Sequence, residues 1–242
     1  AVELLSRLKH SGEMVNLDKI DWLALLALDN AIRLHGDSLA LFRQGRYPSA
    51  FLLSVLSQEE IGKAHTASQF VWMSKDRHEH GGFTQTEEEE FLELLYKHPH
   101  KQGSFLANSH IGMSLLKTEK GRKIYQDVFD GSLEGEKQKA TYVGLKRHRG
   151  KIDLKGRVSQ PLSKISKKKA GRQISIVHDY LVDACVGIIS DQYDYEISSI
   201  KRVINRRLYK QLRREWPIRN RSTKKRIRVI EKFLRKEGMN PL

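Results

Sequence analysis

Cysteine and long apolar runs are the two features that this chain of 242 residues most clearly lacks. Its single cysteine, Cys185, excludes an internal disulfide and favours a reducing compartment. The longest apolar runs, such as residues 22–28, are far shorter than the roughly 20 residues that a membrane-spanning helix needs. The first residues show no basic stretch followed by an apolar one, so we expect no export signal. These absences predict a cytoplasmic protein with no membrane partner.

Alternation of apolar and polar residues, the pattern of half-buried β-strands, is also scarce, whereas helical periodicity dominates the chain. We expect an all-α fold: an antiparallel helical bundle over residues 1–195 and a basic helical extension over residues 196–242. The pattern predicts helices over residues 17–44, 45–74, 86–96, 101–117, 196–215 and 222–237, and a long helix that ends near residue 191. Asn16, Thr86 and Ser222 are the expected N-caps.

The net charge of +15 is concentrated in two blocks of the chain. Residues 1–145 hold 17 Lys and Arg against 20 Asp and Glu, whereas residues 146–172 hold 11 against 1 and residues 201–242 hold 16 against 3. Such blocks are typical of proteins that bind a polyanion, because cations that replace counterions along a phosphate backbone favour binding. RNA is the partner that this distribution favours, and a solvated helix face or an acidic protein partner is the alternative.

Residues 45–63 place two neighbouring carboxylates in a helix that is otherwise rich in apolar residues. At 100° per residue, Glu60 projects from the middle of the apolar face, where an unpaired carboxylate is strongly unfavourable. Glu59 lies four residues before Lys63, a spacing that favours an ion pair within the helix. We therefore predict that Glu59 pairs with Lys63 and that Glu60 needs a partner from another helix.

Four short segments carry a family resemblance. They are Arg46-Tyr47-Pro48-Ser49-Ala50, Glu59-Glu60-Ile61-Gly62-Lys63, His100-Lys101-Gln102 and Lys137-Gln138-Lys139-Ala140-Thr141-Tyr142-Val143. Together they resemble the AbiV family of bacterial abortive-infection proteins, which is placed among the HEPN-like helical bundles. The resemblance extends over roughly residues 20–190. It implies an antiphage protein that arrests an infected cell by shutting down translation, a homodimer, and a phage-encoded activator protein as a further partner.

The resemblance also implies a candidate active site, because many HEPN-like proteins are metal-independent endoribonucleases with an Arg-x4-6-His motif. Residues 172–178 match that spacing. His178 would take the proton of the 2′-hydroxyl, Arg172 would hold the phosphate, and Glu60 would orient one of them. On a regular helix, however, Arg172 and His178 lie about 120° apart. The structural alternatives are that His178 is a packed histidine and that Arg172 is simply one member of the basic block. For Glu60, the alternative is a buried ion pair with a cation such as Lys101.

The other candidate residues fall into two groups. Glu59, Lys63, His100 and Lys101 form an expected structural signature, and the expected RNA contacts are Lys167, Lys168, Lys169, Arg206, Arg207, Arg213 and Arg214. Tyr209, near these cations, either stacks on bases or packs between helices. No cluster of thiolates is present, and we expect no metal and no cofactor.

Two functions follow from these observations. The first is an effector that acts on RNA (tRNA, mRNA or rRNA) or on the translation machinery, with endoribonuclease activity as one form of that action. The second is a helical module without enzymatic activity that blocks translation by binding protein or ribosomal RNA.

Overall fold

The computed structural model describes residues 16–77, 84–107, 116–144, 147–148, 151–152, 158, 160–190 and 200–236. Residues 16–144 contain α2 (Leu17–Arg43), α3 (Tyr47–Arg77), α4 (Gln85–Leu94), α5 (His98–Ala107), α7 (Glu119–Phe129) and α8 (Ser132–Thr141). A two-residue antiparallel ladder of β1 (Arg147–His148) and β2 (Lys151–Ile152) follows. The second half contains α9 (Pro161–Lys164), α10 (Lys167–Ile189), α11 (Ile200–Val203), α12 (Arg206–Glu215) and α13 (Arg221–Lys236). The prediction of an all-α fold is confirmed.

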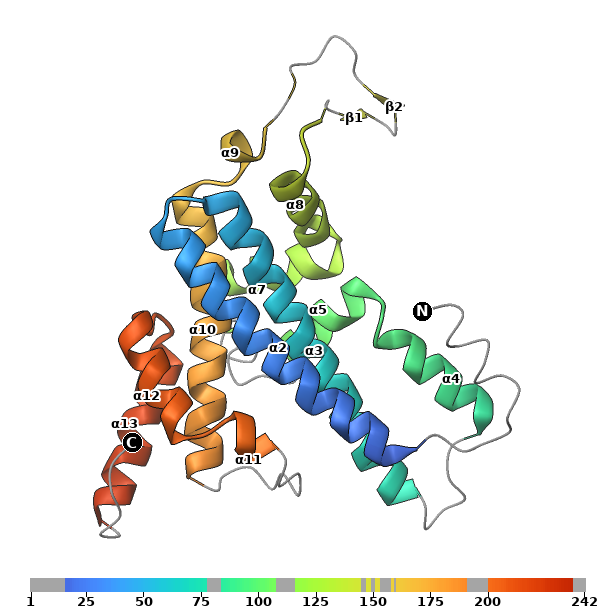
Figure 1. Cartoon of the computed structure of the whole chain (residues 1–242), viewed down its shortest axis with the longest axis vertical. Helices are drawn as coiled ribbons and strands as arrows, with labels where there is room; N and C mark the ends of the chain where they lie inside the picture. The colour runs from blue at the N-terminus through green and yellow to red at the C-terminus, as the bar shows by residue number, and fades with distance from the viewer. Residues whose placement is uncertain are drawn as a thin grey trace.

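Helix α3 is the central element of the bundle. It packs along α2 in an antiparallel hairpin and also contacts α5, α8 and α10 (Figure 1). The hairpin turns at Gly45, whose φ of +78° favours glycine, and Pro48 lies in the first turn of α3. Because helices pack against several sides of α3, it buries residues on more than one side and has no single apolar face.

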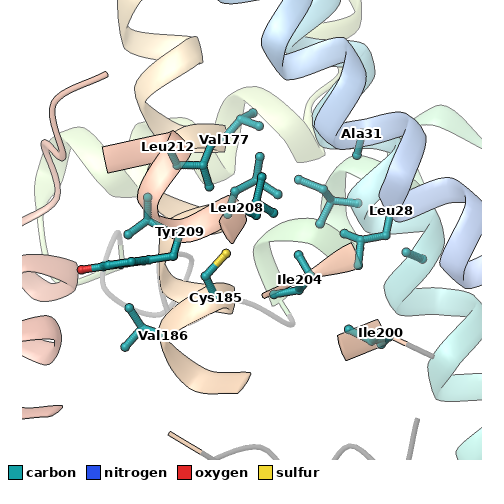
Figure 2. Packing of buried hydrophobic residues seen from close by; sticks show 14 of the residues in the cluster. Leu28, Ala31, Val177, Cys185, Val186, Ile200, Ile204, Leu208, Tyr209 and Leu212 are labelled. Carbon is teal, nitrogen blue, oxygen red and sulfur yellow. The ribbon is translucent and has the colours of Figure 1, made fainter. Parts of the chain in front are cut away.

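Helices α11, α12 and α13 share a hydrophobic core with α2 and α10 (Figure 2). Ile204, Leu208 and Leu212 pack in the same cluster as Leu28 of α2 and Val177 of α10. The segment from 200 to 236 therefore packs against the bundle. The expected boundary between residues 195 and 196 lies outside the described residues.

Several helix ends differ from the predictions. The expected capping box at Thr86 and Glu89 forms instead at Thr84 and Glu87, two residues earlier, because the same signature occurs there. The helix expected over 196–215 is interrupted, since Asn205 caps α12 by accepting a hydrogen bond from the backbone N–H of Leu208. Asn220, and not Ser222, accepts the first backbone N–H bonds of α13.

The N-cap Asn16 and the helix after it agree with the prediction. The parts of the predicted helices that fall on 108–115 and 191–199 lie outside the described residues. None of the helices in the part of the chain that the structure describes is both long enough and apolar enough to span a membrane.

Candidate functional site

His178 is completely buried in the middle of α10. Its Nδ1 lies 3.1 Å from Nε2 of His35 on α2, so one ring donates a hydrogen bond and the other accepts it. Burial lowers the pKa of His178 to about 4, although the Trp216 backbone acts in the opposite direction, and burial beside His178 lowers the pKa of His35 to about 3. Both imidazoles are therefore neutral at pH 7. In this conformation His178 has no exposed surface from which to accept a proton from RNA.

Arg172 and Glu60 lie apart from that buried pair. Arg172 is exposed in the second turn of α10, and six residues of helix separate its Cα from that of His178 by about 9 Å along the axis. Glu60 is half-buried, accepts a hydrogen bond of 3.2 Å from Asn30 and lies 3.8 Å from Lys63. The structure thus does not gather Arg172, His178 and Glu60 into one constellation.

Glu59, rather than Glu60, is the deeply buried carboxylate of α3. It is 1% exposed, and it accepts hydrogen bonds from Gln102 of α5 at 2.8 Å and from Lys137 of α8 at 3.0 Å. Nδ1 of His98 lies 2.7 Å from its other oxygen. The predicted pair of Glu59 with Lys63 is wrong, because Glu59 points between α5 and α8 whereas Lys63 pairs with Glu60. We call Glu59, His98, Gln102, Glu134 and Lys137 the Glu59 cluster.

The Glu59 cluster contains three groups of the kinds that bind metal ions. Ligand atoms of Glu59, His98 and Glu134 all lie within 4.8 Å of one another. The Lys137 ammonium lies 3.0 Å from Glu59, 2.6 Å from Glu134 and 3.3 Å from His98 Nδ1. A lysine of the chain therefore supplies the positive charge that these two carboxylates require. This arrangement suits a buried ion-pair network that fastens α5 and α8 to α3.

The other signature residues line the contact between α3 and α5. A Cβ at Gly62 would lie 1.8 Å from the backbone oxygen of Lys101, so only glycine permits the two helices to approach this closely. Lys101 is buried, its ammonium lies 3.9 Å from Glu59, and burial lowers its pKa against the opposing effect of Glu59. His100 lies 3.5 Å from the Thr66 hydroxyl, and burial lowers its pKa. These residues therefore take part in the packing of α5 against α3.

The C-terminal helices carry the largest set of outward-facing cations among the described residues. Leu208 and Leu212 of α12, like Ile227 and Ile230 of α13, are buried. The opposite faces present Arg207, Lys210, Arg213, Arg214, Lys224, Lys225, Arg228, Lys232 and Arg235 to solvent. Arg206 is half-buried at the start of α12. Four of the seven cations predicted to contact RNA, Arg206, Arg207, Arg213 and Arg214, thus lie on one helix.

A groove runs between α12 and α13. One hollow of about 470 Å³ is lined by Arg213, Trp216, Lys224, Arg228 and Glu231, among others. A second hollow of about 360 Å³ shares Arg213 and Glu231 with the first and adds Tyr209. We call the two hollows together the α12–α13 groove.

The remaining predicted RNA contacts lie at the start of α10. Lys167 and Lys168 are exposed in its first turn. Lys169 forms an ion pair with Glu136 of α8, and its backbone N–H is capped by Ser166. Two of these three lysines therefore face solvent, whereas the third joins α10 to α8.

His35 and Trp216 contribute contacts that the sequence did not predict, and His98 contacts Glu59. Trp216 donates a hydrogen bond of 3.0 Å to Ser175 of α10, and its ring packs edge-on against Phe42. Pro217, which follows Trp216, predicts the end of a helix but does not predict the contact of Trp216 with α2 and α10. His98 stands immediately before the Pro99-His100-Lys101 segment, so its closeness to a recognised motif was the one available signal.

Comparison with known proteins finds a matching family. The family model HEPN_AbiV, described as AbiV, matches residues 21–181, which is well over half of the chain. No curated protein matches. No solved structure matches either.

Proposed function

Because the chain belongs to the AbiV family of HEPN proteins, we propose that it is an abortive-infection effector that shuts down translation by binding RNA. The α12–α13 groove, with the exposed cations beside it, is the observation that supports this proposal. The cations lie outside the residues that match the family model, so this part of the proposal rests on the chain's own surface.

The distribution of ion pairs also favours the α12–α13 groove as the RNA-binding surface. Lys137, Lys169 and Arg226 each meet a carboxylate of another helix, so their charges act within the fold. Arg207, Lys225 and Arg228 instead extend into solvent from helices whose apolar faces are already buried. Charges placed in this way interact with an external polyanion at little cost to the bundle.

Binding of RNA to the full chain tests the proposal. We expect the association constant for total tRNA or mRNA fragments to fall steeply with salt, because each phosphate contact releases counterions. The double variant Lys224→Glu/Arg228→Glu should weaken binding by about tenfold or more at 0.1 M salt and should relieve inhibition of a cell-free translation reaction. The matched control is Lys19→Glu/Lys123→Glu, which reverses two exposed charges elsewhere on the bundle. Equal effects of the two double variants would contradict the proposal.

Endoribonuclease activity is the second candidate function. The observation that favours it is the direct contact of His178, the histidine of the Arg-x5-His spacing, with a second imidazole, His35. In this buried conformation the lowered pKa of both rings makes them weak bases. His178 would need the segment around Trp216 to move before RNA reached it. Incubation with total RNA in excess EDTA tests this candidate: cleavage by the wild type that is lost in His178→Ala supports it, and intact RNA with salt-sensitive binding supports binding alone.

The homodimer and the phage-encoded activator stay predictions. Sedimentation of the full chain measures the first. Co-purification from phage-infected cells measures the second.

A further inference from the structure

The α12–α13 groove contains one feature that binding to phosphates does not explain. Glu231 lines both hollows and is the only carboxylate among their lining residues in the described part of the chain. It forms no ion pair with any described residue. A carboxylate among cations repels phosphate groups, so its presence in an RNA groove requires a different contact.

Tyr209 is a second polar group of the groove, and the Arg213 guanidinium and the Glu231 carboxylate both act electrostatically on it. The residue is 3% exposed, and its hydroxyl makes no hydrogen bond with the described residues. In Figure 2 its ring lies beside Cys185 and its hydroxyl points away from the apolar cluster. The same side chain lines the second hollow. Buried polar groups in folded proteins are nearly always hydrogen-bonded, and a movement of the Tyr209 side chain would bring this buried hydroxyl to a ligand in the second hollow.

The groove also holds a fixed aromatic ring. The Trp216 indole is held in place by its hydrogen bond to Ser175 and by the edge-on contact with Phe42, with ring centroids 5.1 Å apart. Aromatic rings beside Arg side chains are the usual elements of sites for single-stranded RNA, where bases stack and cations follow the backbone. Arg213 lies between the two hollows and 5.9 Å from the Tyr209 ring.

We propose that the α12–α13 groove binds single-stranded RNA and selects guanine through Glu231. This inference rests on the proposed function, because it takes RNA as the ligand. The Watson–Crick edge of guanine presents two adjacent donors, N1–H and the exocyclic amino group, which match the two oxygens of a carboxylate. Adenine and cytosine present an amino group beside an acceptor, and uracil presents a single N–H between two acceptors. A carboxylate therefore favours an unpaired guanine over the other three bases.

The experiment measures the binding of the full chain to four labelled RNA decamers by fluorescence anisotropy. Each decamer is oligo-uridine with G, A, C or U at the central position. We expect the G-containing decamer to bind about tenfold more tightly than the all-U decamer, as for a bidentate contact to one base. Glu231→Gln should abolish this preference while leaving binding to the all-U decamer equal or slightly tighter. Glu215→Gln, which removes a half-buried carboxylate at the end of α12, is the matched control and should keep the preference.

A preference for guanine that survives in Glu231→Gln would overturn the inference. It would also fail if the wild type bound all four decamers equally while Lys224→Glu/Arg228→Glu still weakened binding, and in that case the proposed function would stand. Absence of binding to every decamer and to tRNA would instead contradict the proposed function itself. Tyr209→Phe supplies a second measurement: we expect severalfold weaker binding to all four decamers with an unchanged thermal midpoint. A lower midpoint with unchanged binding would assign the hydroxyl an internal role.

Discussion

The Glu59 cluster and the α12–α13 groove are both rich in charge, but they use it in opposite ways. In the Glu59 cluster, a carboxylate that is 1% exposed meets donors from α5 and α8, and the charges are balanced inside the bundle. In the groove, cations on two amphipathic helices face solvent and surround a single carboxylate. The difference shows that local charge density does not identify a binding site. What identifies it is whether the fold already supplies the partners.

The largest expected effect is on stability, from substitutions in the Glu59 cluster. Glu59→Ala leaves the buried Lys137 and Lys101 ammonium groups without their shared carboxylate, and we expect a loss of about 3–5 kcal/mol in the free energy of unfolding. Urea denaturation measures this loss. Glu60→Ala, one residue later on the half-buried side of α3, is the matched control and should cost about 1 kcal/mol or less.

A double-variant cycle separates the ion pair from the packing. Glu59→Gln/Lys137→Met removes both charges at similar volume, so it should be more stable than either single variant. If the two single substitutions were additive, the charges would not interact as the 3.0 Å contact indicates.

Gly62→Ala is expected to have the next largest effect. Its Cβ would lie 1.8 Å from the Lys101 backbone oxygen, so α5 must move away from α3 and strain the Glu59 cluster. We expect a loss of about 1–3 kcal/mol, although alanine is the better helix former. Gly36→Ala on α2, where nothing lies within 4 Å of the added Cβ, is the control and should be neutral or stabilising. A stable Gly62→Ala variant with an unchanged unfolding midpoint would contradict the close approach.

Acid should destabilise the His35–His178 pair, which lies between α2 and α10. Burial lowers the pKa of both rings below the ordinary value near 6.5, so the unfolded chain binds more protons between about pH 6.5 and 4. The free energy of unfolding therefore falls as pH falls through this window, by about 1 kcal/mol per pH unit for each ring. Asp179 acts in the opposite direction, because burial raises its pKa to about 6. His178→Gln should reduce the pH dependence measured by urea denaturation between pH 7 and 5. An unchanged slope would mean that the pKa of His178 is the same in the folded and unfolded states.

The fold could be predicted from the sequence because helical periodicity and caps are local signals. Asn16, Gly45 and Pro48 mark the hairpin of α2 and α3 by rules that involve only neighbouring residues. The same rules predict a start of α4 that is two residues too late, since Thr84 and Thr86 both precede a glutamate at the required spacing.

The orientation of α3 could not be predicted in the same way. Helical periodicity identifies a buried face only when a helix buries one side, whereas α3 packs against α2, α5, α8 and α10. The prediction therefore places Glu59 and Glu60 on the wrong sides of the helix. Two partners of Glu59 are also distant in sequence: His98 is 39 residues away and Lys137 is 78 residues away. The cations of α12 and α13 were predictable, because residues 201–242 hold 16 Lys and Arg against 3 Asp and Glu.

The smallest expected effect completes the comparison between the two charged regions. Neutralising Arg207, Lys225 and Arg228 with Gln removes charges that face solvent from helices whose apolar faces stay buried. We expect the free energy of unfolding to change by no more than about 0.5 kcal/mol, since exposed substitutions away from caps and cores are close to neutral. Relief of mutual repulsion among these cations favours a slight gain. If this triple variant lost as much stability as Glu59→Ala, the cations would serve the fold, and the contrast on which the RNA proposal depends would disappear.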